Sequence, residues 1–262
     1  MGLYHAKPED GAAWITGAST GIGREMAKKL ANEGYTVYAS ARSADALESL
    51  ASEYSGRGKI IPLPLDVTDR AANLAAVTRI TRESGCLILA IFNAGMFIPI
   101  RGSELEFSTF EKSIALNVSG VLNGLLPSID AMKSAGKGQI AIVSSSAGYG
   151  GLPKSAAYGA TKAALINMAE SLKFDLDPLN IRIQIVTPGF VKTPATDKND
   201  FTMPFLMEAD EAADAFAKGL KSDAFDVTFP KRFTFILKAI NLLPYRLYFW
   251  LVSRQTGIGG AE

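Results

Sequence analysis

Hydrophobic residues along this chain fall into two alternating kinds of segment. Short, almost uninterrupted apolar runs predict buried strands at residues 12–16, 36–40, 59–65, 87–92, 139–144 and 182–187. Longer stretches with helical spacing lie between them, at residues 22–33, 44–54, 70–84, 107–134 and 156–176, and the fourth leaves room for a break. Strands that alternate with helices form a parallel sheet covered on both faces, and right-handed crossovers make it doubly wound. The pattern therefore predicts a single α/β domain over residues 1–262.

The regular alternation stops near residue 190, where prolines begin to punctuate the sequence. We expect residues 190–262 to form a substrate lid and an extended helical C-terminus, with two short amphipathic helices around Pro244. Lys, Arg and Asn interrupt the apolar residues of 229–254, so a membrane-spanning helix is not expected there. A pocket cover or a contact between copies of the chain is the commoner role of such a segment. Its aromatic and basic residues also allow weak peripheral contact with a membrane.

Charge and rare residues exclude several classes of function. The 27 Lys and Arg nearly balance the 26 Asp and Glu, which leaves a net charge of +1 and no electrostatic case for nucleic acid. His5 is the only histidine, so neither a histidine-based triad nor a His-rich metal site is expected. Cys86 is the only cysteine, which excludes an internal disulfide, and the N-terminal leader has no apolar signal-peptide region. These features predict a cytoplasmic protein without a metal.

A glycine-rich turn follows the first predicted strand and opens the first helix. Glycines there let backbone N–H groups approach a phosphate at the helix N-terminus. The spacing G-x-x-x-G-x-G differs from the usual dinucleotide pattern, and a plain tight turn needs glycine too. Its position after the first strand of an alternating chain favours nucleotide binding. The candidate residues are Gly17, Ser19, Thr20, Gly21, Ile22 and Gly23.

The end of the second strand indicates which dinucleotide binds. Enzymes that use NAD usually carry Asp or Glu there, to bind the ribose 2′-hydroxyl. This chain has no acid at that point, and Arg42 follows Ala41. A carboxylate would repel a 2′-phosphate, whereas an arginine can bind it through two hydrogen bonds. The sequence therefore favours NADP(H) over NAD(H), although Arg42 could also be an ordinary solvated loop residue.

Two more polar segments follow strands, at the sheet edge where open α/β sheets bind ligands. Asp66-Val67 ends the third strand, and Asn93-Ala94-Gly95 ends the fourth. Asp66 could accept a hydrogen bond from an adenine amino group, or it could cap the helix that begins after Thr68 or Asp69. The sequence does not separate these two roles.

Tyr158 and Lys162 are four residues apart in a predicted helix, so their side chains share one face. A fixed ammonium stabilises a phenolate, which would make Tyr158 an acid/base group near neutral pH. The spacing alone is common by chance, and an exposed amphipathic helix would carry it equally well. The surrounding motifs decide between these readings.

Those motifs together resemble the short-chain dehydrogenase/reductase family in its single-domain form, over roughly residues 10 to 195. They occur in the family's order: residues 16–23, Asp66-Val67, Asn93-Ala94-Gly95, Asn117, residues 144–148, Tyr158 with Lys162, and Pro188-Gly189. The resemblance implies a Rossmann-type fold and a catalytic tetrad of Asn117, Ser145, Tyr158 and Lys162. Tyr158 would exchange a proton with the substrate oxygen, and Lys162 would hold the nicotinamide ribose and lower the Tyr158 pKa. Asn117 would support a water that relays protons, or would bond the backbone at a helix kink.

Three consecutive serines precede the tyrosine, and two family rules select Ser145. The orienting serine lies about thirteen residues before the tyrosine, as the second serine of S-S-x-A-G. If the strand continued, Ser144 and Ser146 would point to the other face. The resemblance also implies that Pro188 and Gly189 shape the nicotinamide pocket, which Val191 and Thr193 would contact. Many family members end with a strand that carries Asp and a glycine pair, and this chain is expected to lack it.

The implied activity is hydride transfer between a nicotinamide and the carbonyl or alcohol carbon of a small molecule. We expect residues 96–99, 147–153 and 195–206 to line the substrate pocket with Met96, Phe97, Tyr149, Leu152, Phe201, Met203 and Phe205. Such residues suit an apolar substrate, although they could equally pack together as a closed lid. A homodimer or homotetramer is expected. The competing functions are a non-catalytic dinucleotide sensor or scaffold, and a peripheral membrane protein.

Overall fold

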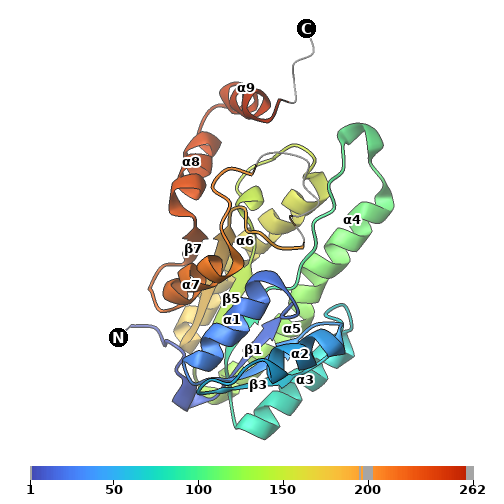
Figure 1. Cartoon of the computed structure of the whole chain (residues 1–262). Helices are drawn as coiled ribbons and strands as arrows, with labels where there is room; N and C mark the ends of the chain where they lie inside the picture. The colour runs from blue at the N-terminus through green and yellow to red at the C-terminus, as the bar shows by residue number, and fades with distance from the viewer. Residues whose placement is uncertain (1, 195, 197–202, 258–262) are drawn as a thin grey trace.

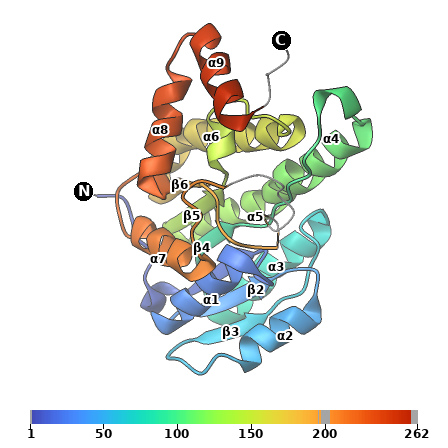
Figure 2. The ribbon, with the colours of Figure 1, turned by 45° about the horizontal axis from the view of Figure 1, so that its top comes forward.

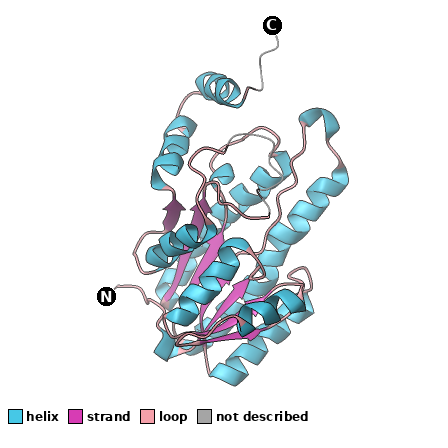
Figure 3. Cartoon of the chain, viewed as in Figure 1, coloured by secondary structure: helices cyan, strands magenta, loops and turns pink. Residues whose placement is uncertain are grey.

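Seven parallel strands form the single sheet that the computed structural model describes, within residues 2–194, 196 and 203–257 (Figures 1 and 3). Their order is β3-β2-β1-β4-β5-β6-β7. The direction of strand addition reverses between β1 and β4, and ligands of open α/β sheets bind at such a point. The strands are β1 (Ala12–Thr16), β2 (Thr36–Ser40), β3 (Lys59–Pro62), β4 (Leu87–Phe92), β5 (Gly138–Val143), β6 (Ile181–Pro188) and β7 (Asp226–Phe229). All six predicted strands are present, and the third ends at Pro62, before residue 65.

Helices cover both faces of the sheet, as predicted (Figure 2). One face packs against α1 (Gly21–Asn32), α2 (Ala44–Ser52) and α7 (Ala209–Leu220). The other packs against α3 (Arg70–Ser84), α5 (Gly120–Ala135) and α6 (Ala156–Leu176). Along β1, Ala13 and Ile15 join the first core, while Ala12 and Trp14 join the second. Strands buried on both sides need apolar residues at every position, which explains the uninterrupted runs in the sequence.

The expected lid of residues 190–262 is divided by the structure, because α7 and β7 belong to the core. Ala213 and Phe216 of α7 are buried, and α7 lies beside α1 in Figures 1 and 2. Strand β7 pairs in parallel with β6 and carries Asp226. The expectation that no C-terminal strand with Asp exists was therefore wrong, although β7 itself carries no glycine. A four-residue edge strand with alternating burial gives only a weak signal in a sequence.

Two short helices flank Pro244, as predicted. They are α8 (Lys231–Asn241) and α9 (Tyr245–Thr256), drawn in red beyond the sheet in Figure 1. We call them the α8–α9 hairpin. Tyr248 anchors it by donating a hydrogen bond of 2.7 Å to the Gly151 carbonyl.

Among the described residues, one helix, from Phe107 to Ala135, has the length and the apolar composition that could cross a membrane. It consists of α4 (Phe107–Ile114), a π-helical turn (Ala115–Ser119) and α5. Its middle packs closely on the sheet, because a Cβ on Gly124 would lie 2.7 Å from the Phe92 ring. This close approach places α5 against the second core, to which Val121, Leu125 and Met132 belong.

Candidate active site

A cleft of about 1520 Å³ opens at the carboxyl ends of the strands and brings most of the predicted site residues together. It is lined by Gly17, Ser19, Thr20, Gly21, Ile22, Arg42, Asp66, Val67, Asn93, Ala94, Gly95, Ser145, Tyr158, Lys162, Pro188, Gly189, Val191 and Thr193. Gly23 and Asn117 do not line it, and both lie behind residues that do. The cleft therefore spans the expected nucleotide end and the expected substrate end.

Tyr158 and Lys162 both face this cleft from the first turns of α6. Lys162 is 3% exposed. Its ammonium lies 5.6 Å from the centre of the Tyr158 ring and donates a hydrogen bond of 2.9 Å to the Val143 carbonyl. Ser144 donates to the Lys162 carbonyl at 2.8 Å, which ties α6 to the end of β5. The lysine is thus held by the backbone beside the phenol.

Burial acts on the two groups in opposite directions. It lowers the pKa of Lys162 to about 8, because the ammonium loses solvation. It raises the pKa of Tyr158, and a hydrogen bond with Ser145 lowers that pKa by a smaller amount. This direction differs from the expected lowering of the Tyr158 pKa by Lys162, because desolvation of the phenol outweighs other effects in this geometry. A protonated phenol at neutral pH is the form that can donate a proton.

Asn117 lies in the π-helical turn and is fully buried. Its Oδ1 accepts from the Met96 N–H at 2.8 Å, and its Nδ2 donates to the Met96 carbonyl at 3.0 Å and to the Thr161 hydroxyl at 3.1 Å. A Cβ on Gly95 would lie 3.3 Å from the Lys162 Nζ and 3.4 Å from the Asn117 Oδ1. The predicted helix distortion is present, and it places Asn117 directly behind Lys162.

Of the three serines, Ser145 is the one whose hydroxyl lies at the Tyr158 phenol. The alternation of side chains along a strand does not explain this position. Strand β5 has already ended at Val143, and Ser145 caps a short turn by accepting from the Ala147 N–H at 3.2 Å. All three serines touch the cleft. Ser144 is committed to the Lys162 carbonyl, whereas the Ser145 hydroxyl lies near enough to the Tyr158 phenol to lower its pKa.

The glycine turn is tightly folded and borders the cleft. Gly17 and Gly21 have φ angles of +69° and +56°, a region that favours glycine. A Cβ on Gly23 would lie 2.3 Å from the Gly17 carbonyl oxygen. Thr20 caps α1 with extended backbone and without a side-chain hydrogen bond, so the first N–H groups of the helix face the cleft. Asn93 supports the turn by donating to the Gly17 carbonyl at 3.0 Å.

Arg42 and Asp66 lie at the nucleotide end of the cleft, and the structure separates the two roles considered for Asp66. Asp69 caps α3 by accepting from the Ala72 N–H at 3.0 Å, so Asp66 is not the cap. Asp66 instead accepts from the N–H and hydroxyl of Thr68 at 2.9 and 2.7 Å. These bonds, and then the charge of Arg42, lower the pKa of Asp66. Arg42 is exposed at the cleft, where it can meet a phosphate.

The substrate end is lined by apolar residues, some of which the sequence did not indicate. Phe97 packs edge-on against Tyr158, with ring centres 5.0 Å apart. The inner side of the α8–α9 hairpin adds Phe233, Ile236, Leu237, Ile240, Leu251 and Val252. Their helical spacing was the available signal, since it is the apolar face of an amphipathic helix. The expected role of the hairpin as a pocket cover matches this position.

The expected pocket residues are not all found in the cleft. Met96, Phe97, Leu152 and Phe205 line it, whereas Met203 does not, and Phe201 lies outside the described residues. Tyr149 is directed away from the cleft, because its hydroxyl bonds Thr187 and Asp226. Asp226 also accepts from Lys238, so this network fastens α8 to the sheet.

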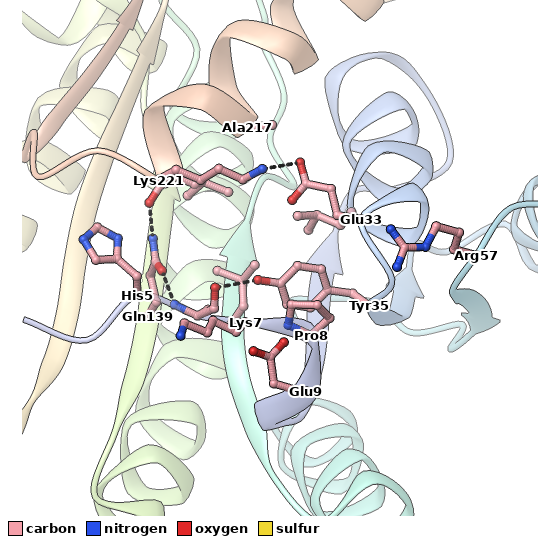
Figure 4. A pocket seen from close by; sticks show the side chains of 14 residues that line it. His5, Lys7, Pro8, Glu9, Glu33, Tyr35, Arg57, Gln139, Ala217 and Lys221 are labelled. Carbon is pink, nitrogen blue, oxygen red and sulfur yellow. Dashed lines mark hydrogen bonds and ion pairs between the residues drawn. The ribbon is translucent and has the colours of Figure 1, made fainter.

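A second pocket of about 470 Å³ lies at the amino ends of the strands, far from this chemistry (Figure 4). Several of its polar groups already have partners, since Lys221 pairs with Glu33 at 2.7 Å and Tyr35 donates to the Ala6 carbonyl at 2.7 Å. Within the described part of the chain, no group of three or more His, Cys, Asp or Glu is arranged to hold a metal ion.

The comparisons with known proteins agree on one family. The sequence model of short chain dehydrogenases matches residues 11–203. An uncharacterized oxidoreductase of Myxococcus xanthus is 35% identical over 237 residues, which are 90% of this chain and 94% of that protein. A 3-oxoacyl-acyl-carrier-protein reductase of Thermotoga maritima is 35% identical over 185 residues, 70% of this chain and 75% of that protein.

A solved structure extends the likeness to three dimensions. The alcohol dehydrogenase from the archaeon Thermococcus sibiricus, complexed with 5-hydroxy-NADP, has a TM-score of 0.75 and 26% identity, and covers 83% of this chain and 95% of its own. The non-catalytic sensor is therefore disfavoured. The chain belongs to the short-chain dehydrogenase family and is an oxidoreductase that transfers hydride at CH–OH or C=O groups.

Proposed function

We propose that this enzyme is an NADP(H)-dependent reductase of apolar ketones or aldehydes. The observation that carries the cofactor preference is Arg42, which lies in the cleft after β2, where an NAD enzyme would carry an acid. The complex of the related alcohol dehydrogenase with 5-hydroxy-NADP supports the same class of cofactor. The name of the Thermotoga maritima relative, a 3-oxoacyl reductase, supports reduction of a ketone.

Four residues would carry out the proton chemistry. Ser145 hydrogen-bonds the substrate oxygen and stabilises the negative charge that develops there. Tyr158 donates its phenolic proton to that oxygen, and its raised pKa keeps the proton available at neutral pH. Lys162 holds the ribose hydroxyls, and Asn117 fixes the backbone behind Lys162 for proton resupply. Bound NADPH would supply the hydride, which joins the carbonyl carbon as the oxygen takes the proton.

The walls of the cleft suit a substrate with an apolar body. Phe97, Leu152 and Phe205 surround the tyrosine end, and the hairpin adds aliphatic side chains. A hydrophobic wall distinguishes substrates by size more than by polarity. We therefore expect longer apolar ketones to react with a lower KM than short polar ones.

The cofactor proposal is tested by exchanging the charge at position 42. Arg42→Asp removes a charge-assisted pair and adds repulsion, so we expect the Kd for NADPH to rise at least about tenfold, while NADH binding holds or improves. Arg82→Gln, at a 74% exposed side chain on α3, is the matched control and should change neither Kd. Tighter binding of NADH than NADPH by the unmodified enzyme would contradict the proposal.

Two properties of the whole protein complete the proposal. Copies of the chain are proposed to associate as a homodimer or homotetramer through exposed apolar residues such as Ile114, Leu126 and Phe174. A cytoplasmic location is proposed because Cys86 is a free thiol, as is usual in a reducing compartment.

A further inference from the structure

The outer side of the α8–α9 hairpin exposes large apolar side chains with no covering element among the described residues. Leu242 and Tyr245 are 86% and 79% exposed, and Phe235, Phe249 and Trp250 are each more than half exposed. In α9 the rings of Tyr245 and Phe249 stack with their centres 5.9 Å apart. Exposed rings gathered at one end of a molecule mark an interaction surface.

Charge on the same segment is strongly one-sided. Residues 227–256 contain five Lys or Arg and no Asp or Glu. The chain as a whole has 27 cations and 26 anions, so removing those five cations leaves the remainder with a net charge of −4. Lys238 is paired with Asp226, whereas Lys231, Arg232 and Arg246 are exposed. Arg254 is also exposed, lies 5.5 Å from the Trp250 ring centre and borders the cleft.

We propose that the outer side of the α8–α9 hairpin docks on an anionic lipid surface. Basic and aromatic residues interleaved on short amphipathic helices are the composition of segments that lie in a membrane interface. The rings would enter the headgroup region, and the arginines would meet phosphate groups at its edge. A symmetric contact with the same side of a second copy would instead bring like charges together.

The hairpin is fastened to the catalytic domain, so docking would fix how the enzyme faces the lipid. The Lys238–Asp226 pair holds α8, and the bond from Tyr248 to the Gly151 carbonyl holds α9. The inner side of the same helices lines the cleft with Ile236, Leu237 and Leu251. An apolar carbonyl compound dissolved in the bilayer would then reach Tyr158 along this wall. That consequence rests on the proposed function, whereas docking itself does not.

The test is co-sedimentation of the full chain with vesicles of phosphatidylcholine, with and without phosphatidylglycerol. We expect binding to anionic vesicles to be at least about tenfold stronger than to neutral ones, and to weaken as salt is added. Arg246→Glu and Trp250→Ser should each reduce it several-fold. The matched controls on α3, Arg82→Glu and Leu74→Ser, should not, since Leu74 is also more than half exposed.

NADPH binding by each variant, measured by fluorescence, shows that the fold is intact and keeps this test independent of turnover. Failure of the unmodified chain to sediment with anionic vesicles would overturn the proposal. Loss of self-association in the hairpin variants, with vesicle binding unchanged, would show that a second copy covers this surface and would overturn it as well.

Discussion

Tyr158 and Lys162 share one face of α6, yet burial pushes their protonation in opposite directions. The phenol keeps its proton more firmly, and the ammonium releases its proton more easily, because each loses solvation of its charged form. Lys162 is 3% exposed and has the Val143 carbonyl as its hydrogen-bond partner. A carbonyl offers only partial compensation for a buried charge. Burial of the charged Lys162 therefore lowers the free energy of unfolding, and we attribute its presence to the chemistry of the site.

This cost predicts a pH dependence of stability. Below pH 8, Lys162 is protonated in both the folded and the unfolded chain, so its burial penalty is fully present. Between pH 8 and about 10 the folded state releases the proton first, and stability relative to a neutral residue rises by up to about 1.4 kcal/mol per pH unit. The free energy of unfolding of the natural chain minus that of Lys162→Met should therefore increase with pH over this window, as measured by urea denaturation.

Taking this difference cancels the contributions of other groups that titrate in the same range, because the tyrosines and Cys86 are common to both proteins. If the difference in free energy of unfolding between the two proteins stays constant from pH 7 to 10, Lys162 is not buried in its charged form.

At this scale, motif positions in the sequence predicted residues that the structure brings together around one cleft, but did not predict the direction of their pKa shifts. Ser145 was chosen among three serines and lies beside Tyr158 in the cleft, yet the strand whose alternation was part of the argument ends at Val143. The pKa of Tyr158 is raised by burial, and burial comes from packing with residues far away in the sequence, of which Phe97 is one that contacts the ring. No local sequence pattern encodes that packing.

At the scale of elements, the nucleotide end depends on how closely the glycine turn folds against itself. Gly23 lies in the first turn of α1, against the Gly17 carbonyl, and Asn93, directly after β4, donates a hydrogen bond to that carbonyl. Backbone atoms on both sides leave no room for a side chain. The turn is therefore set by three segments together and not by the glycines alone.

We expect Gly23→Ala to damage cofactor binding. Its Cβ would lie 2.3 Å from the Gly17 carbonyl oxygen, so the turn must open and its N–H groups must shift. NADPH affinity should fall at least about tenfold and stability by about 1–3 kcal/mol, as measured by titration and by thermal melting.

Gly102→Ala is the control, because a Cβ there meets nothing within 4 Å. It should leave both quantities unchanged. Equal NADPH affinity in the two variants would contradict the role given to the glycine turn.

The elements that the sequence predicted are those with long, strongly periodic patterns. Six strands and five helices were placed within a few residues, because two-sided burial makes their apolar runs continuous. Helix α7 was missed although its signal was present: Glu208 and Glu211 form a capping box ahead of buried Ala212, Ala213 and Phe216. Strand β7 carried little signal, since only two of its four residues are buried and it pairs on one side.

At the scale of the whole molecule, the candidate site residues lie at one end of the sheet, and the opposite end is covered by the N-terminal segment. The carboxyl ends of the strands open into the cleft under the hairpin, whereas the N-terminal segment packs over the amino ends (Figure 4). The outer surfaces of α4, α5 and α6 carry the exposed apolar residues that we assign to association between copies of the chain.

We expect light scattering to give the unmodified protein a mass at least twice that of one chain. Phe174 is 81% exposed on α6, so Phe174→Glu should place a charge in the contact and shift the protein toward the monomer. Lys218→Glu, on α7, should leave the mass unchanged. A monomeric natural protein would refute the proposed association without touching the catalytic assignment.

The central claim is that Tyr158 donates the proton in an NADPH-dependent carbonyl reduction, and one assay tests it most directly. Oxidation of NADPH is followed by absorbance with a panel of apolar ketones and aldehydes, for the natural enzyme and for Tyr158→Phe. The account predicts turnover by the natural enzyme and a loss of roughly 10²- to 10⁴-fold in kcat for the variant, with NADPH still bound. Equal rates for the two proteins with a reactive ketone would contradict it.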